Sequence, residues 1–437
     1  MVTELTVHRI VAGGAGLAEL DGLKVFVPYA APEERVRARI TERKRDYAVA
    51  AIEEILEPSP LRVDAPCPAY GRCGGCQLQH LTYEGQLVTK KLIVNEALQR
   101  IGGVFIPVAN LKPSTPHWRY RNKTQYPVGR NGTLKVGFYR RGSHDIVDVP
   151  ACLLHPERFD DLRRAAHDAL AASGESAYDE RHHSGNVRHV ILRADGDGRF
   201  LVIIATRTAS VAPALVDALA AQPGVRGVVQ TVNPERTNRI LGQHSRVLAG
   251  TGHLLMAVLD RRFRVSADSF CQVNPGGAAE LCRKVLKQVA PRGDETVIDL
   301  YCGIGMLGIA LARFVRRVIG VELAPPAVAD AWFNAELNDA GNAEFIQGEV
   351  ASIAAALPKA DAVVLDPPRR GCDPDTLRRL AGLAPRTIVY VSCNPATLAR
   401  DLKALEASGY AVTDIEPVDM FPQTHHVETV ARLVRAA

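Results

Sequence analysis

The sequence lacks a long hydrophobic run. The longest uncharged apolar stretch, Leu300 to Ala312, is too short and too rich in glycine to cross a bilayer, which takes about 20 residues. The first residues, MVTELTVHRIVAGG, lack the basic segment and apolar segment of a secretory signal. We therefore expect a cytoplasmic protein with no membrane partner.

Paired metal-binding motifs are also missing. The nine cysteines show neither the paired C-x2-C spacing typical of zinc sites nor the three-cysteine loop of radical S-adenosylmethionine enzymes. In a reducing compartment, cysteines indicate metal binding or catalysis rather than disulfides. The composition is ordinary for a globular protein, with 47% hydrophobic and 23% charged residues, and 437 residues predict two to four domains. The net charge of +5 weakly indicates a polyanionic partner.

Residues 1–60 predict a small β-barrel, followed by a Pro-rich linker. Short β-prone runs at 5–10, 24–27, 35–40 and 48–55 are separated by glycine and proline. Alternation places Arg35, Arg37 and Arg39 on one face of a strand. Small barrels often bind nucleic acid on such a face, although a solvated edge would have the same pattern.

Three cysteines lie within ten residues of a glycine-rich loop, at Cys67, Cys73 and Cys76. Their sulfurs can converge, so a metal site is favoured over three unrelated thiols. Cys152 is the candidate fourth ligand, with His80 and His155 as alternatives. Thiolate ligands alone leave zinc and iron–sulfur open. The remainder of residues 61–260 alternates predicted helices (159–172, 212–221) with strands (188–193, 200–206, 227–232), which indicates a central α/β domain.

The stretch from Lys112 to Arg141 is basic and aromatic. It has no Asp or Glu, and it contains Lys or Arg at eight positions and aromatic residues at Trp118, Tyr120, Tyr126, Phe138 and Tyr139. Cations neutralise phosphates and aromatic rings stack on unpaired bases, so this composition favours RNA binding. A solvated hairpin with Asn131-Gly132 at its turn is the alternative.

From about residue 290, predicted strands alternate with helices, which is typical of a doubly wound, Rossmann-like parallel sheet. The expected strands are 296–300, 317–321, 344–347, 361–365 and 387–391, and the expected helices are 306–313, 327–339 and 396–405. A glycine turn follows the first strand, and Glu322 ends the second, a spacing that suits an adenosine ligand. The turn CGIGMLG is compatible with binding of either NAD or S-adenosylmethionine.

Cys393 lies between the strand 387–391 and the helix 396–405, where ligands bind in open α/β sheets. Asn394 fits the N-cap of this helix and Pro395 its first turn. A helix N-terminus lowers the pKa of a thiol, so Cys393 is a candidate nucleophile. A small buried core cysteine is the commoner alternative.

Six segments together resemble the ordered motifs of the RNA uracil-5-methyltransferases. They are FCQVN (270–274), DLYCGIGMLGIALA (299–312), GVE (320–322), LDPPRRGC (365–372), VYVSCNPATLARDL (389–402) and DMFPQTHHVETVA (419–431). The cysteine pattern resembles the four-cysteine iron–sulfur site of that family, and residues 11–40 resemble a TRAM domain. The resemblance is nearest to the bacterial branch that acts on 23S ribosomal RNA.

The resemblance implies three domains, at 1–60, 61–260 and 261–437, and a reaction at uracil C5. Cys393 would add to C6 of the ring, and Glu428 would remove the C5 proton. S-adenosylmethionine would be bound by Gln272, Tyr301, Glu322 and Glu349, while Asp366 would contact the uracil edge or the cofactor amine. A [4Fe-4S] cluster on Cys67, Cys73, Cys76 and Cys152 would be structural. Met306 and Cys271 depart from the family pattern near the cofactor.

The expected partner is ribosomal RNA, with transfer RNA possible, and the expected state is a monomer. The alternatives, in order, are a transfer RNA uracil-5-methyltransferase, an RNA cytosine-5-methyltransferase, and a non-catalytic iron–sulfur protein that binds RNA. Cytosine enzymes usually place the cysteine after proline, whereas Cys393 precedes Asn-Pro. An intact Cys393 and Glu428 argue against the non-catalytic alternative.

Overall fold

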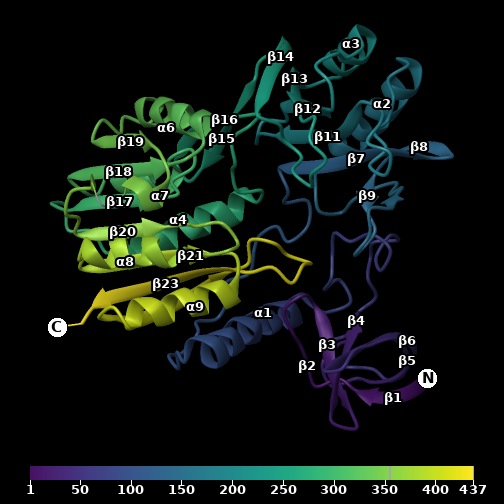
Figure 1. The fold of residues 1–437 in the computed structure, drawn as a ribbon, viewed down its shortest axis with the longest axis horizontal. Helices are drawn as coiled ribbons and strands as arrows, with labels where there is room; N and C mark the ends of the chain where they lie inside the picture. Colours follow the sequence, from purple (N-terminus) through teal and green to yellow (C-terminus); the bar gives the residue numbers. More distant parts are fainter. Residues whose placement is uncertain (354–355, 437) are drawn as a thin grey trace.

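Three sheets make up most of the protein (Figure 1). The computed structural model describes residues 1–353 and 356–436. A six-stranded N-terminal sheet (purple) and a six-stranded central sheet (blue to teal) lie on one side, and a seven-stranded C-terminal sheet (green to yellow) lies on the other. Within the described residues, no helix has the length and apolar character needed to span a membrane.

The N-terminal sheet curls on itself. Its strands are β1 (Val2–Thr6), β2 (Arg9–Ile10), β3 (Ala15–Leu20), β4 (Leu23–Pro28), β5 (Arg35–Arg43) and β6 (Tyr47–Glu57), in the order β1-β5-β6-β4-β3-β2. The edge strands β1 and β2 are joined by only two residues, so the two edges must come together. This agrees with the predicted small barrel, except that the expected strand 5–10 is broken in two and β3 was not predicted.

The arginine face of β5 does not carry free positive charge. Arg35 pairs with Glu4 and Glu57. Arg37 pairs with Glu54, and Arg39 pairs with Glu53 at 2.9 Å. The strands β6 and β1 bring these acids beside the arginines and neutralise much of the face, so the charge of this strand adds little to the expectation that it binds nucleic acid.

The central sheet has the order β14-β13-β12-β11-β7-β8. Its strands are β7 (Lys123–Asn131), β8 (Thr133–Val136), β11 (Val187–Ala194), β12 (Phe200–Thr206), β13 (Val225–Val232) and β14 (His244–Gly250). The helices α2 (Glu157–Ala172) and α3 (Pro213–Ala220) pack together and share one hydrophobic core with it. Two small hairpins, β9 (Phe138–Tyr139) with β10 (Ile146–Val147) and β15 (His253–Val258) with β16 (Arg261–Ser266), lie outside the sheet.

The hairpin with its turn at Asn131-Gly132, which was the alternative interpretation of this stretch, is present, because β7 and β8 pair across it. The interpretation of the five aromatic residues was partly wrong. Tyr120 and Tyr126 are 5% and 0% exposed and belong to the interior, so they cannot stack on bases. Trp118, Phe138 and Tyr139 remain partly exposed.

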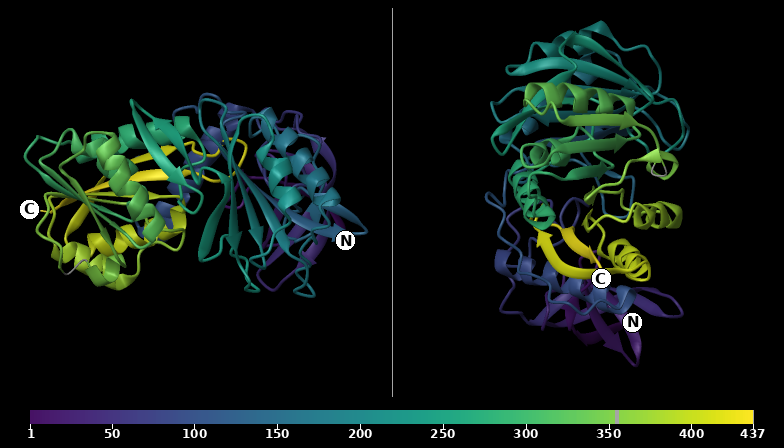
Figure 2. Two further views of the ribbon diagram at one scale, coloured as in Figure 1. Left: turned by 90° about the horizontal axis from the view of Figure 1, so that it is seen from above. Right: turned by 90° about the vertical axis from the view of Figure 1, so that its left-hand side faces the viewer.

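The C-terminal sheet has the order β19-β18-β17-β20-β21-β23-β22. Five strands are parallel: β17 (Thr296–Leu300), β18 (Arg317–Glu322), β19 (Ala343–Gln347), β20 (Ala362–Leu365) and β21 (Thr387–Ser392). The predicted doubly wound fold is confirmed, and the structure adds two antiparallel strands, β22 (Tyr410–Val418) and β23 (Glu428–Arg435). The strands are buried apolar runs because helices cover both faces (Figure 2).

The helices of this half are α4 (Pro275–Val289), α5 (Met306–Ala312), α6 (Pro325–Leu337), α7 (Val350–Ile353), α8 (Pro374–Gly382) and α9 (Pro395–Glu406). One further helix reaches the C-terminal sheet from much earlier in the chain. The helix α1 (Tyr83–Ala97) continues into a π-helical turn, η1 (Leu98–Gly102), and both pack on α9. Val94 and Leu98 share a hydrophobic core with Leu398 and Leu402 of α9.

Candidate active site

The carboxyl ends of β17, β18, β20 and β21 meet at one edge of the C-terminal sheet. The pairs β17–β18, β17–β20 and β20–β21 are parallel neighbours, so their following loops must leave on the same side. These loops carry Tyr301, Glu322, Asp366 and Cys393. Four residues predicted at separate places in the chain therefore lie along a single edge.

The glycine turn after β17 is bonded to the acid that ends β18. The carboxylate of Glu322 accepts hydrogen bonds from the backbone N–H of Gly303 at 3.1 Å and of Ala324 at 2.8 Å. Gly305 has a φ of +81°, and a Cβ there would lie 2.9 Å from the ring of Phe345. Only glycine fits this position, so the turn keeps an open backbone next to an ordered carboxylate, as an adenosine ligand needs.

The other residues predicted to hold the cofactor surround this turn. Tyr301 has a left-handed φ of +60° and is half-buried directly after β17. Glu349 is exposed just beyond β19 and precedes α7. Gln272 is buried three residues before α4, a helix that packs against β20, β21 and β23. Its carbonyl accepts a hydrogen bond from the Asn122 side chain at 3.3 Å.

The turn that presents Cys393 has the predicted construction. The side chain of Asn394 caps α9 by accepting a hydrogen bond from the Ala396 N–H at 3.1 Å, and Pro395 opens the helix. Leu398 and Leu402 are fully buried on the face toward the core. Cys393 itself is half-buried, so its sulfur is not part of the closed core.

The loop after β20 is fastened to α9 by contacts that no sequence pattern indicated. Asn394 and Thr397 both donate hydrogen bonds to the carbonyl of Arg369, at 3.0 and 3.2 Å. Asp401, fully buried, accepts hydrogen bonds from the N–H of Cys372 at 2.9 Å and from the hydroxyl of Tyr390 at 2.5 Å. These bonds fix the Asp366 loop against the Cys393 turn. The one sequence signal for these bonds was the presence of the polar residues Thr397 and Asp401 in the predicted helix 396–405.

The electrostatics of this edge are dominated by burial. Burial raises the pKa of Asp366, and burial together with the charge of Asp366 raises the pKa of Glu428, whereas Arg369 opposes the rise. Glu428 is 3% exposed, and its Oε2 atom has no hydrogen-bond partner among the described residues. Two carboxyl groups that repel each other in a buried place hold protons more tightly than usual, so both are available for proton transfer near neutral pH.

The predicted lowering of the Cys393 pKa was wrong. Burial, followed by the negative charge of Glu428, raises the pKa of this thiol to about 11, although Arg369 lowers it. The helix N-terminus is outweighed by burial and by the nearby carboxylates. With its pKa raised, this thiol must lose a proton before it can act as a nucleophile.

His425 and His426 lie two to three residues before Glu428, with ring centroids 4.0 Å apart. Burial lowers the pKa of His425 to about 4 and that of His426 to about 3. Both rings are therefore neutral at physiological pH. Neutral imidazoles of such low basicity are weak proton acceptors, which favours Glu428 as the base.

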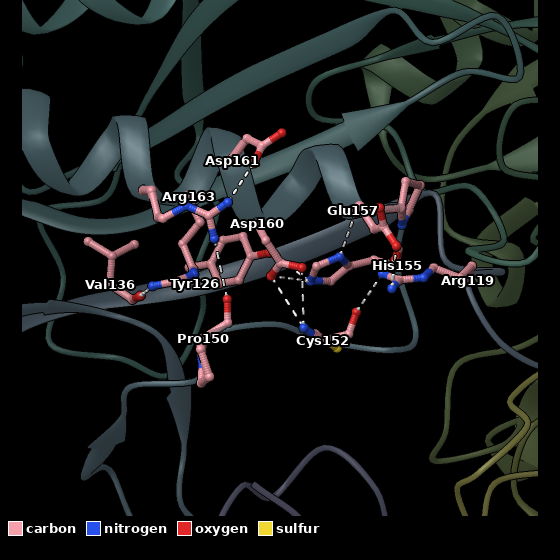
Figure 3. Close-up of polar contacts among 12 residues, drawn as sticks. Arg119, Tyr126, Val136, Pro150, Cys152, His155, Glu157, Asp160, Asp161 and Arg163 are labelled. Atoms are coloured by element: carbon pink, nitrogen blue, oxygen red, sulfur yellow. Dashed lines mark hydrogen bonds and ion pairs between the residues drawn. The ribbon is translucent and has the colours of Figure 1, made fainter. Parts of the chain in front are cut away.

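Cys67, Cys73, Cys76 and Cys152 line one cavity of about 400 Å³. The backbone of Cys152 is held from both sides (Figure 3): its N–H donates to the Asp160 carboxylate at 3.3 Å, and its carbonyl accepts from Arg119 at 3.4 Å. Burial raises the pKa of the Cys152 thiol to about 11 and also raises that of Cys73. A cation or a metal cluster would be needed to keep such thiols ionised.

The two histidines considered as fourth ligands are occupied. The ring of His80 contacts the Tyr70 hydroxyl at 2.6 Å and the Ala30 carbonyl at 3.2 Å. The ring of His155 contacts the Tyr126 hydroxyl at 2.9 Å and the Pro156 carbonyl at 3.0 Å. Cys152 is therefore the better candidate for the fourth ligand.

In residues 1–353 and 356–436, no three His, Cys, Asp or Glu side chains converge closely enough to hold a single metal ion. Zinc binds thiolates at about 2.3 Å, which would require such convergence. The four thiols are instead spread around a cavity. Four thiols lining one cavity are soft donors of the kind that cysteine-based metal sites use.

Comparison with known proteins identifies the chain's relatives. Residues 246–436 match the family model described as tRNA (Uracil-5-)-methyltransferase. An uncharacterized RNA methyltransferase of Bacillus cereus is 44% identical over 435 residues, covering 97% of this chain and 94% of the relative. Another from Halalkalibacterium halodurans is 42% identical over 444 residues, covering 99% and 96%.

Among solved structures, the Pyrococcus abyssi tRNA (uracil-54, C5)-methyltransferase in complex with S-adenosyl-L-homocysteine has a TM-score of 0.80. It is 28% identical in sequence, and the match covers 98% of this chain and 99% of that one. The similarity therefore includes all three sheets. With relatives this similar along almost its whole length, the chain belongs to the RNA (uracil-5-)-methyltransferase family, whose members use S-adenosylmethionine to methylate RNA.

Proposed function

We propose that the protein methylates C5 of uridine in structured RNA through a covalent intermediate on Cys393. The observation that carries the proposal is geometric: β21 and β23 pair Ser392 with Thr429, which brings Cys393 beside Glu428. The loop that carries Asp366 is bonded to the turn that carries Cys393. A nucleophile and a proton acceptor at one site are what addition to a pyrimidine ring requires. Family membership supports the same chemistry.

The thiolate of Cys393 adds to C6 of the uracil, which makes C5 nucleophilic. S-adenosylmethionine, when bound, supplies the methyl group that C5 takes. The Cys393 thiol must first lose its proton, and Asp366, whose pKa burial has raised, is the nearby group that receives it, so Glu428 stays ionised for the later step. Arg369 favours the thiolate, since its positive charge lowers the pKa of Cys393.

Glu428 completes the reaction. It accepts the proton from C5, the C5–C6 double bond re-forms, and the Cys393 sulfur leaves with the electron pair of the S–C6 bond. Its buried and unpartnered Oε2 atom is free for this contact. In this proposal Gln272, Tyr301, Glu322 and Glu349 hold the cofactor, and Asp366 contacts the uracil edge or the cofactor amine.

Replacing Cys393 by alanine should abolish methylation, with a loss on the order of a thousandfold or more, because it removes the proposed nucleophile. Tritium transfer from labelled S-adenosylmethionine to an RNA transcript measures this. Cys282→Ala, which removes a buried thiol on α4, is the matched control and should stay active. Full turnover by the Cys393 variant would refute the assigned nucleophile.

Replacing Glu428 by glutamine should trap a methylated RNA–protein adduct, because the thiolate cannot leave while the C5 proton remains. General-base removal typically slows a step about 10²- to 10⁴-fold. Denaturing gels with labelled RNA reveal the adduct. Glu416→Gln, a change at another buried carboxyl on β22, should release its product normally. An adduct-free Glu428 variant with normal turnover would exclude this role.

We further propose that Cys67, Cys73, Cys76 and Cys152 hold a [4Fe-4S] cluster with a structural role, since no step of the reaction needs an electron. Protein purified without oxygen should be brown and contain about four iron atoms per chain. Cys152→Ala should lose iron, and Cys282→Ala should retain it. A colourless, zinc-containing protein would contradict the cluster. A Cys73 variant that folds and methylates normally would contradict its structural role.

We propose 23S ribosomal RNA as the substrate, on the resemblance of the cysteine loop and of the TRAM-like N-terminal sheet to the bacterial ribosomal branch. Transfer RNA is the alternative, which the similarity to the Pyrococcus abyssi enzyme favours. In a deletion strain, 5-methyluridine should disappear from a site in 23S RNA and remain in transfer RNA. Mass spectrometry of both RNA fractions measures it, and loss from transfer RNA alone would reverse the assignment.

A further inference from the structure

The segment 419–427 places Glu428. It leaves β22 after Val418 and enters β23 at Glu428, and these two residues face each other across the strand pair. In Figure 1 this segment (yellow) extends from the C-terminal sheet toward the N-terminal half of the protein. Contacts that hold this segment in place therefore also restrict the position of the Glu428 carboxyl.

Helix α1 holds the start of this segment. The ammonium of Lys90 contacts Asp419 Oδ1 at 2.5 Å and donates to the carbonyl of Phe421 at 2.9 Å. The hydroxyl of Tyr83 donates to Asp419 Oδ2 at 2.7 Å. The side chains of Lys90 and Asp419 are fully buried, so displacing the segment would leave a charge unpaired in the interior.

Gln423, in the middle of the segment, is held on three sides. Its N–H donates to Gln86 Oε1 at 2.9 Å, and its Oε1 accepts from Gln86 Nε2 at 3.0 Å. Its carbonyl accepts from the N–H groups of Gln77 at 3.1 Å and Leu78 at 3.0 Å. Gln423 has a φ of +71°, which is unfavourable for a side chain larger than glycine. These hydrogen bonds are what maintain that conformation.

The same bonds join the segment to the cysteine loop. Gln77 directly follows Cys76, and its side chain donates to the carbonyl of Gly74 at 2.8 Å. Gln423 thus connects the loop that carries three thiols, the helix α1 and the segment that ends at Glu428. Gln86 holds Gln423 to helix α1, because its side chain bonds both the backbone N–H and the side-chain oxygen of Gln423.

We propose that Gln86 and Gln423 are positioning residues for the proton-abstraction step. They hold segment 419–427 against the cysteine loop, and this sets the Glu428 carboxyl relative to Cys393. The inference rests on the proposed function, since it assigns the proton from C5 to Glu428. It adds that Gln86, which lies in the N-terminal half of the chain, controls removal of the C5 proton. The addition of Cys393 to C6 does not depend on it.

The test is Gln86→Ala in the full-length protein. Methyl transfer to RNA in a single turnover should stay within about twofold, while release of RNA slows by at least about tenfold, since small displacements of a catalytic group have large effects. The methylated adduct should accumulate on denaturing gels. Amide hydrogen exchange in 419–427 should rise, and binding of S-adenosylmethionine should not change.

The matched control is Gln230→Ala. Gln230 is also a fully buried glutamine, and among the described residues its side chain bonds Thr206, Thr208 and Arg246, all in the central part of the chain. This variant should form no lasting adduct. Equal slowing of transfer and release by Gln86→Ala, or release at the normal rate, would overturn the inference.

If Gln86→Ala does not fold, Tyr83→Phe decides the question, because it removes only the hydroxyl that anchors Asp419 at the start of the same segment, and it should also slow release. Normal release by that variant would overturn the inference. The Glu428→Gln result separates the two levels of the proposal. If Glu428→Gln accumulates the adduct and the positioning variants do not, the positioning role alone is refuted. If Glu428→Gln accumulates no adduct, the proposed function is refuted.

Discussion

Parallel pairing of β17, β18, β20 and β21 is the constraint on which the site depends. Parallel neighbours end at the same edge, so a glycine turn, an acid, the Asp-Pro-Pro loop and a cysteine turn meet although about 90 residues separate the first from the last. The buried, apolar strands hold that edge rigid. The loops need only small additional bonds to become ordered, such as those from Gly303 to Glu322 and from Asn394 to Arg369.

Burial then determines the chemistry of the edge. Burial raises the pKa of Cys393, Asp366 and Glu428. The charge of Asp366 raises the pKa of Glu428 further, and both carboxylates raise that of Cys393, so protons remain on groups that would lose them in water. Arg369 is the opposing charge. The site is consequently poised to exchange protons rather than to keep a permanent thiolate, which suits a reaction that makes and later breaks a bond to sulfur.

The N-terminal half is bonded into this site and is more than an appended module. Helix α1 shares a core with α9, the Lys90–Asp419 pair is fully buried, and the cysteine loop donates two backbone hydrogen bonds to Gln423. Asn122, which precedes the first strand of the central sheet, bonds the carbonyl of Gln272. Segments far apart in the sequence therefore converge on the catalytic edge from two sides.

The sequence by itself determined the C-terminal fold class, most strand positions there, the cap of α9 and the cofactor-type turn, because these depend on short-range patterns of apolar, glycine and capping residues. The tertiary structure decided what depends on distant neighbours. The glutamates that neutralise Arg35, Arg37 and Arg39, the burial of Tyr120 and Tyr126, and the raised pKa of Cys393 are examples. Burial and charge pairing act between residues that are remote in the chain, so no local pattern records them.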